Sequence, residues 1–350
     1  MRRHRRASIL YVAAMATMAP LWGAHAQGSP APVSEGRVAA YTAATASIQL
    51  ATVLESFLYE REYFPYLLLG TATVQGLPAL FAGAEPARIN AAVQLGLDAV
   101  YAGSALVFGE HPGTPLLFNA AHKYSMFASY DSYASLRSSA GYGGYGDEDR
   151  HSFLELASAP FDYRAYAHWS VAGFVGSMGA YSLISMLSVD RPDAVWSTGE
   201  AYIGDYRFSP WAGVALILLL QVPNFVLTGV GEEALYRGVY YEELAYRLGE
   251  WPAKLIDGAY FTLSHYPQRW DEIASSPTGE VIMTSLLSMA QAFWFQYIYE
   301  WRGLRSAVAA HAAADVIVFF CDWLAQAGVP NRSGFSIGER ALSIGVTLRL

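Results

Sequence analysis

Long apolar segments recur through most of this chain and constrain its fold more than any other feature. The candidate membrane spans are residues 43–58, 63–82, 91–108, 168–187, 210–230, 281–299 and 304–325. Several of them approach the ~20 residues that a helix needs to cross the hydrocarbon core of a bilayer. The others are shorter or contain Gly, Gln and Asn, which is typical of helices buried inside a bundle. The sequence therefore predicts an all-α, polytopic transmembrane helix bundle of about seven or eight spans.

The small proportion of charged residues agrees with a membrane protein. Charged residues make up 15% of the 350 residues and hydrophobic residues make up 53%, whereas soluble domains carry charge on about a quarter of their residues. A lipid-facing surface explains the difference, because charged side chains are costly in lipid. The net charge of −8 includes no tract of Lys or Arg, so we expect membrane lipid, and not nucleic acid, as a partner. Cys321 is the single cysteine, which excludes an intrachain disulfide.

The first 26 residues have the three parts of a secretory signal. These parts are a basic region with Arg2, Arg3, Arg5 and Arg6, a mostly apolar stretch at 7–22, and the small residues of Ala24-His25-Ala26. We predict a signal peptide at 1–26 that is cleaved before Gln27, with an uncleaved signal anchor as the alternative. Either form directs the chain into a bacterial-type export route. We therefore expect a multi-pass protein of the bacterial inner (cytoplasmic) membrane.

The rest of the chain divides into four regions. We predict an N-terminal helical membrane region at 27–129, a polar Gly/Tyr-rich connection at 130–166, a second membrane domain at 167–327 and a tail at 328–350. The glycines and acidic residues of the connection are typical of a flexible linker. In the tail, apolar and polar residues alternate from 342 to 350, which is the period of a short β-strand. Together with a signal peptide, such a strand can indicate an outer-membrane β-barrel, which remains a minor alternative.

Ionisable side chains lie within or beside three apolar segments of the C-terminal half. Each costs roughly 2.5–3.5 kcal/mol at the centre of a membrane helix, so such residues indicate a functional site. The first cluster directly follows the span 210–230 and contains Glu232, Glu233 and Arg237. If the helix continues, Glu233 and Arg237 are four residues apart and can pair on one face, whereas Glu232 points elsewhere. A surface ion pair at a helix end would produce the same pattern.

The second and third clusters each place a histidine four positions from a second residue of interest. Phe261 would share a helical face with His265, and His311 would share one with Asp315. Taken singly, His265 could be a buried histidine of the core, and His311 could form a buried hydrogen bond with Asp315 that only stabilises the packing of the helices. Taken together, the clusters combine buried carboxylates with histidines. That combination suits the activation of water, in which a base takes a proton and hydrogen-bond donors stabilise the oxyanion.

In their order and spacing, the three clusters resemble the motifs of the CAAX protease and bacteriocin-processing family (CPBP or Abi), which includes the CAAX prenyl endopeptidase. The family pattern is EExxxR, then FxxxH, then HxxxN or HxxxD. The matching residues are Glu232, Glu233, Arg237, Phe261, His265, His311 and Asp315. The resemblance covers roughly residues 165–327 and implies a helical intramembrane protease domain at 167–327.

The resemblance also implies a role for each residue of the site. Glu232 would be the base that activates the attacking water, with help from His265, and His311 with Asp315 would stabilise the tetrahedral oxyanion. Asp315 stands where the family often has Asn. Because an ionised carboxylate would repel an oxyanion, Asp315 would be protonated, be paired with His311, or act differently.

The remaining three residues of the motifs would support the site. The resemblance implies that Glu233 pairs with Arg237 and holds the first helix in place, and that Phe261 packs beside the histidine of its own helix.

We therefore predict an intramembrane endopeptidase that hydrolyses a peptide bond of a membrane-associated peptide or protein through glutamate-activated water. We expect no cofactor and no metal. Histidines with carboxylates could also bind zinc, which makes a metallopeptidase the second choice, although the helical HExxH motif is absent. A non-catalytic membrane binding or scaffold protein, or a bacteriocin-immunity-type protein, could use the same polar site. Bacteria do not generally prenylate CAAX proteins, so that substrate is not expected here and the substrate stays unknown.

Overall fold

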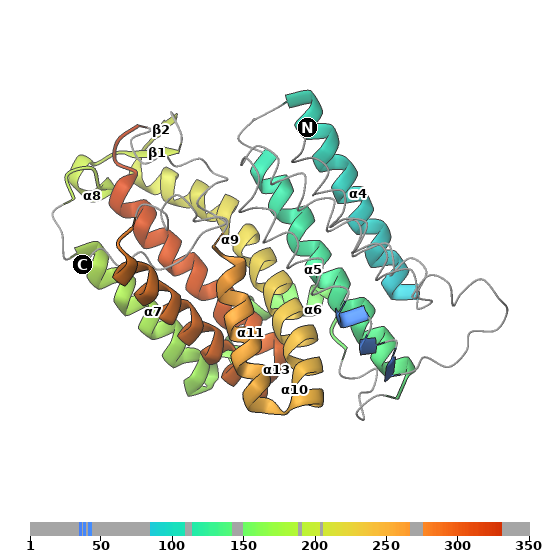
Figure 1. Cartoon of the computed structure of the whole chain (residues 1–350). Coiled ribbons are helices and arrows are strands. Elements are labelled where there is room, and N and C mark those ends of the chain that lie inside the picture. The colour runs from blue at the N-terminus through green and yellow to red at the C-terminus, as the bar shows by residue number, and fades with distance from the viewer. Residues whose placement is uncertain are drawn as a thin grey trace, which may run out of the picture.

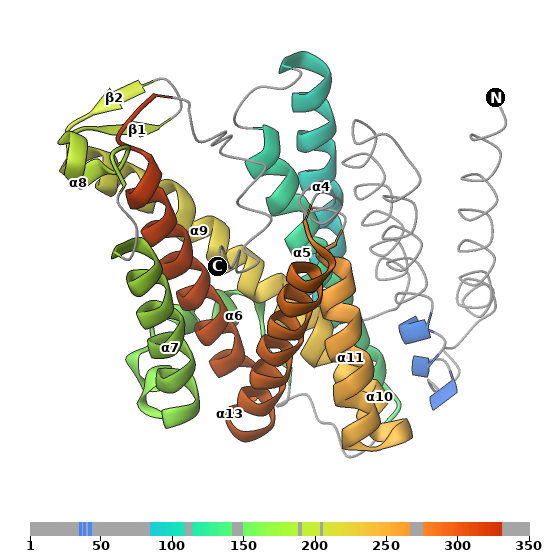
Figure 2. The same cartoon turned by 60° about the vertical axis from the view of Figure 1, so that its left-hand side comes forward.

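The computed structural model describes residues 35–36, 38–39, 41–43, 85–108, 114–141, 150–187, 191–203, 206–266 and 276–330. The signal segment 1–26, the predicted span 63–82, all but the first residue of the span 43–58, and the alternating tail 342–350 lie outside these residues. The described part of the chain is mostly helical, and its long helices pack side by side (Figures 1 and 2). This confirms the helical class predicted from the sequence.

The main helices of the described residues lie before, within and after the predicted polar connection. They are α4 (Glu85–Phe108), α5 (Thr114–Ser139), α6 (Phe153–Ser158), η4 (Ala159–Phe161), η5 (Tyr163–Ala167), α7 (Trp169–Leu187), α8 (Val195–Thr198), α9 (Pro210–Leu235), the π-helix η6 (Tyr236–Tyr241), α10 (Glu242–Leu248), α11 (Glu250–Ser264) and α13 (Thr278–Gln326). Strands β1 (Ala201–Ile203) and β2 (Tyr206–Phe208) form a short antiparallel hairpin in which Ala201 lies opposite Phe208.

Among the described residues, three helical stretches are long and apolar enough to cross a membrane. They are α7, the continuous stretch Pro210–Leu248 that begins with α9, and α13. The first two contain the predicted spans 168–187 and 210–230 almost completely. The predicted spans 281–299 and 304–325 form the two arms of α13, residues 278–302 and 304–326, which Gly303 separates with a non-helical backbone (φ 75°, ψ 177°). The predicted span 91–108 lies in α4, which is not among the three stretches.

The two arms of α13 form the centre of the bundle. The first arm runs antiparallel to α7, since Trp169 contacts Tyr297 and Phe174 contacts Trp294. The second arm packs along α9, where a Cβ on Gly229 would lie only 3.2 Å from the backbone nitrogen of Ala312. The absence of a side chain at this glycine therefore allows the two helices that carry the ionisable clusters to approach closely.

Helix α5 is a well-packed part of the same bundle, although the sequence places no apolar span there. Its serines bond within the helix: Ser129 donates to the carbonyl of Ser125 at 3.0 Å, and Ser132 donates to that of Ala128 at 2.8 Å. Such bonds satisfy hydroxyl groups without outside partners, so a polar helix can be buried. Residues 130–139 are the last turns of α5, so the connection predicted at 130–166 begins later than the sequence suggested.

The end of the predicted connection is also structured. Ser152 caps α6, and its side chain and that of Glu155 exchange hydrogen bonds with each other's backbone N–H groups. Further along, the hydroxyl of Tyr166 donates to the carbonyl of Pro160 at 2.9 Å and contacts that of Ala309 at 3.3 Å. These bonds hold the segment against the second arm of α13.

Exposed tryptophans mark both ends of the apolar helices. Trp169 and Trp301 both contact Tyr297 and therefore lie at one end. Trp211, at the start of α9, lies at the end that carries the β-hairpin, where Trp196 is also exposed. Since tryptophan is enriched at the two membrane–water interfaces, this distribution suits a bundle that spans a bilayer.

Candidate active site

Two adjacent glutamates at the end of α9 form the centre of the polar cluster. Glu233 is fully buried, and Glu232 is 5% exposed. The sequence places an ion pair between Glu233 and Arg237 on one face, and the structure confirms it, with 3.3 Å between Oε2 of Glu233 and Nε of Arg237. Because Glu232 precedes Glu233 by one residue, it points to another side of the helix and reaches different partners.

The Arg237 side chain lies between two aromatic rings. Its guanidinium carbon is 4.7 Å from the ring centre of Phe261 and 5.3 Å from that of Phe295. Its Nη2 donates to the carbonyl of Ala292 at 3.1 Å, and its Nε lies 4.0 Å from Oδ2 of Asp257. These contacts hold a buried cation in place by cation–π and ionic interactions.

His311 of α13 is held by the second glutamate. Its Nδ1 lies 2.6 Å from Oε1 of Glu233, and its ring stacks on Phe295 with 4.6 Å between centres and an 11° tilt. A carboxylate accepts hydrogen bonds, so Nδ1 carries the proton in this contact. The other ring nitrogen, Nε2, lies 3.7 Å from Oε2 of Glu232 and 3.5 Å from Oδ2 of Asp315.

His265 directly follows α11 and approaches the same glutamate from another side. Its Nδ1 lies 2.7 Å from the carbonyl oxygen of Phe261, and because a carbonyl only accepts, Nδ1 is again the donor. The Phe261 ring also lies beside the imidazole, with 4.6 Å between centres, as the sequence predicted. The Nε2 atom of His265 lies 3.5 Å from Oε2 of Glu232. Behind the histidine, Ser264 contacts Nδ1 at 3.3 Å and accepts a hydrogen bond from the hydroxyl of Tyr236 at 2.7 Å.

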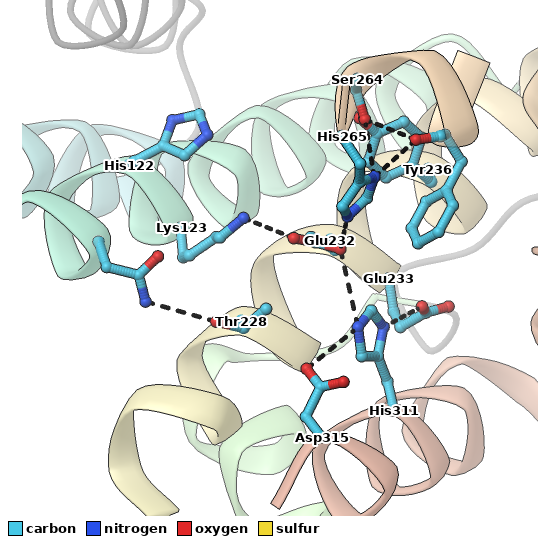
Figure 3. A network of polar contacts seen from close by, with 12 residues as sticks. His122, Lys123, Thr228, Glu232, Glu233, Tyr236, Ser264, His265, His311 and Asp315 are labelled. Atoms are coloured by element: carbon cyan, nitrogen blue, oxygen red, sulfur yellow. Dashed lines mark hydrogen bonds and ion pairs between the residues drawn. The ribbon is translucent and has the colours of Figure 1, made fainter. Parts of the chain in front are cut away.

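The cluster therefore converges on one atom, Oε2 of Glu232 (Figure 3). Both histidines use Nδ1 for support and direct Nε2 toward this oxygen. Among the described residues, no hydrogen-bond donor reaches Oε2. Polar groups separated by more than about 3.5 Å are commonly bridged by water. The geometry can therefore hold a water molecule between a carboxylate and two imidazoles, which is an arrangement suited to general-base chemistry.

The cluster also contains a lysine that was not predicted. Lys123 of α5 places its Nζ 2.5 Å from Oε1 of Glu232, and its side chain is only 4% exposed. Beside it, Asn119 donates to Asn224 at 2.6 Å and contacts the hydroxyl of Thr228 at 3.4 Å. The sequence does contain a hint of this contact, because Lys123 follows Asn119 by four residues in a segment rich in small residues. That segment has no long apolar run, however, and such runs were the feature that located the other clusters.

The structure brings all seven predicted residues into one connected network. Glu232 is flanked by His265 and His311, and Asp315 lies beside Nε2 of His311, the same nitrogen that faces Glu232 (Figure 3). Within the described ranges, no group of three or more His, Cys, Asp or Glu side chains is arranged to hold a metal ion.

Comparison with known families identifies the helices that carry the site. Residues 213–317 match the family described as type II CAAX prenyl endopeptidase Rce1-like, and all three predicted motifs fall within these residues. Helix α5 and Lys123 lie outside them. No curated protein and no solved structure matches the chain.

Proposed function

Because residues 213–317 form a type II CAAX prenyl endopeptidase Rce1-like domain of the CPBP/Abi family in a multi-pass membrane protein, we propose that this protein is an intramembrane endopeptidase that uses Glu232 as its base. The observation that carries the proposal is the convergence of the Nε2 atoms of His265 and His311 on Oε2 of Glu232. The substrate class is a membrane-associated peptide or protein. The bacterial inner membrane is the proposed location.

The first step is the attack of water on the scissile carbonyl. The attacking water is bound to one side of Oε2 of Glu232 and Nε2 of His265, which are 3.5 Å apart, so that it can form a hydrogen bond with each of them. As its oxygen bonds to the carbonyl carbon, one proton passes to Glu232. His265 accepts or donates a hydrogen bond through Nε2 and thereby orients the water, because its Nδ1 stays bound to a backbone carbonyl.

The second element of the reaction is stabilisation of the oxyanion. His311, protonated on both nitrogens, keeps Nδ1–H on Glu233 and donates Nε2–H to the negative oxygen. A carboxylate beside Nδ1 favours this imidazolium form. Asp315, whose Oδ2 lies 3.5 Å from the same Nε2, acts as a protonated carboxyl and contributes a second donor. An ionised carboxylate in that place would repel the oxyanion.

The third step is collapse of the tetrahedral intermediate. The carbonyl forms again, the C–N bond breaks, and the proton held by Glu232 passes to the leaving nitrogen. The products are a carboxyl group and an amine, so the atoms of one water are distributed between them. Glu232 returns to its carboxylate form and can activate another water.

The depth of the site supports cleavage inside the membrane. His311 is the eighth residue after Gly303, at which the second arm of α13 begins, so it lies about 12 Å along that helix at 1.5 Å per residue. Trp301 lies at the same end of this helix and is exposed, and tryptophan is enriched at the membrane–water interface. We place the scissile bond in the half of the membrane nearer to this end.

Cleavage assays with a matched glutamate variant test the proposal. Wild type, Glu232→Gln and Glu242→Gln are purified in detergent and incubated with a peptide library, with and without a chelator, and products are identified by mass spectrometry. Glu242 is a suitable control because it also pairs with a cation of α5, Arg137, at 2.6 Å, but it is not among the ionic contacts of the two histidines.

We expect cleavage by wild type and Glu242→Gln, none by Glu232→Gln, and no effect of the chelator. Loss of cleavage with the chelator would instead indicate a metallopeptidase. Folded wild type that cleaves nothing would favour the non-catalytic binding or immunity function.

A further inference from the structure

The Lys123–Glu232 ion pair joins the active-site glutamate to a helix outside the family domain. Nζ of Lys123 lies 2.5 Å from Oε1 of Glu232, and both side chains are at most 6% exposed. On the basis of the proposed function, we propose that Lys123 is a positioning residue that holds Glu232 ionised and directs Oε2 toward the two histidines. The α5 helix is then a part of the catalytic machinery that the family motifs do not include.

Two glycines of the α9–η6 stretch fix the position of Lys123. A Cβ on Gly231 would lie 2.5 Å from the backbone oxygen of Lys123 and 2.9 Å from its Cα. A Cβ on Gly238 would lie 2.5 Å from the ring of Tyr130. The spacing between the two contacts is the same in both helices, because Gly238 follows Gly231 by as many residues as Tyr130 follows Lys123. The two helices therefore pack in parallel register, with a close backbone contact at Gly231 and a side-chain contact at Gly238, and this register places the ammonium group beside Glu232.

Further polar contacts, nearer the C-terminal end of α5, support this register. Arg137 pairs with Glu242 at 2.6 Å, and the hydroxyl of Tyr133 donates to Glu243 at 3.2 Å. Helix α5 is thus attached along its length to α9 and the helices that continue it. An accidental contact of one flexible lysine would not require this set of interactions.

The charges around Glu232 explain why a cation is needed. The titratable and charged groups around it are His122 and Lys123 of α5, the neighbouring Glu233 of α9, Tyr236 of η6, His265 after α11, and His311 and Asp315 of α13. The buried cation of η6, Arg237, forms its ion pairs with Glu233 and Asp257 and not with Glu232. Within the described ranges, Lys123 is the one Lys or Arg side chain at ion-pair distance from Glu232.

Removal of this cation would change the protonation of the base. A buried carboxylate near other carboxyl groups is stabilised in its neutral form. A protonated Glu232 cannot take a proton from water, so the general-base step would stop. The ion pair engages Oε1, and Oε2 stays directed at the histidines, so the lysine restrains the carboxylate without occupying the reacting oxygen.

Infrared difference spectroscopy can observe the protonation of Glu232 without any substrate. Spectra of the Glu232→Gln protein are subtracted from those of the wild type, and the same subtraction is made in Lys123→Met, Lys123→Arg and Arg137→Met backgrounds. Arg137→Met is the matched control, because it removes a cation of α5 that pairs with Glu242 and not with Glu232.

At neutral pH we expect the carboxylate bands of Glu232 in wild type, Lys123→Arg and Arg137→Met. In Lys123→Met we expect the carbonyl band of a protonated carboxylic acid. Carboxylate bands that persist in Lys123→Met would overturn the proposal. If Lys123→Met does not fold, recovery of folded protein in Lys123→Met/Glu232→Gln would support the charge pairing, and absence of recovery would overturn it.

Kinetic measurements then test the positioning role on any peptide that the wild type cleaves. Because a general base contributes about 10²–10⁴-fold, we expect Lys123→Met to reduce kcat by about 10²-fold at neutral pH, with the acidic limb of the pH profile moved to higher pH. KM should stay nearly constant, and Lys123→Arg should restore most of the rate. An unchanged pH profile would contradict the role. If the wild type cleaves nothing, the proposed function fails, whereas the infrared result still decides whether Lys123 holds Glu232 ionised.

Discussion

Nδ1 of His311 lies 2.6 Å from Oε1 of Glu233, so the second glutamate of the motif binds a histidine directly. Its other oxygen, Oε2, faces the guanidinium of Arg237 at 3.3 Å. Glu233 therefore connects a fixed buried cation to the imidazole that we propose for oxyanion stabilisation. Glu233 thus does more than form the ion pair with Arg237 that the sequence predicts, because it also holds His311 in position.

Glu233→Ala should strongly destabilise the protein. It leaves Arg237 as a buried cation without its nearest carboxylate, and loss of one partner of a buried pair typically costs about 3–5 kcal/mol. Thermal unfolding in detergent measures the effect. Glu250→Ala, which removes an exposed glutamate from the start of α11, should leave the Tm nearly unchanged. Equal Tm values for both variants would argue against the buried pair.

Asp315→Asn should retain most of the activity. If Asp315 acts as a neutral donor beside His311, the amide of Asn supplies a donor of similar size, so we expect kcat within about tenfold of wild type. Asp315→Leu removes the donor and should reduce kcat by about 10²–10³-fold. Rates of peptide cleavage at saturating substrate provide the comparison. A rate for Asp315→Asn as low as that for Asp315→Leu would show that the negative charge is required.

Gly303→Ala should destabilise the protein through its backbone alone. Gly303 has φ 75° and ψ 177°, a region almost restricted to glycine, where other residues cost about 1–3 kcal/mol. A Cβ there would meet no atom within 4 Å, and the same is true of Gly279 in the first turn of α13. Gly279→Ala should therefore leave stability equal or higher by up to about 1 kcal/mol. Thermal unfolding should give a lower Tm for Gly303→Ala and an equal or higher Tm for Gly279→Ala. An unchanged Tm for Gly303→Ala would contradict a strained backbone at this position.

Gly231→Ala should reduce both stability and activity. The added Cβ would lie 2.5 Å from the backbone oxygen of Lys123, and because backbone cannot rotate away, α5 must move at a cost of about 1–3 kcal/mol. The shift would also draw the ammonium group from Glu232. Gly176→Ala on α7, where a Cβ meets nothing within 4 Å, is the control for Tm and kcat. Wild-type kcat in Gly231→Ala would mean that the register of α5 does not matter to the site.

The sequence predicts those parts of the site that lie on apolar helices with short, fixed spacing. His311 and Asp315 are neighbours on one helix, and Glu233 pairs with Arg237 in the same way, so a spacing of four residues is enough to predict each pair. The break between the two predicted spans at 281–299 and 304–325 also follows from composition. These features depend on local periodicity, which is visible in the chain itself.

The contribution of α5 could not be predicted in this way. Its burial depends on serine hydroxyls that bond within the helix, and Lys123 meets Glu232 only through contact between distant segments. The same contact also determines how Glu232→Gln should behave. Glu232→Gln keeps the shape of the side chain, but it leaves a buried lysine without its counter-charge, so we expect lower stability as well as lost activity.

The parallel contact between α5 and α9 has a consequence for any attempt to transplant this site into another protein. The residues matched to the family, 213–317, bring Glu232, Glu233, Asp257 and Asp315 into one interior, with Arg237 as the fixed positive charge among them. A fragment cut at the ends of the match would lack Lys123, the cation that pairs with Glu232, and an unpaired charge is costly in lipid. We therefore expect that a graft of this site into another protein needs α5 as well as the residues matched to the family.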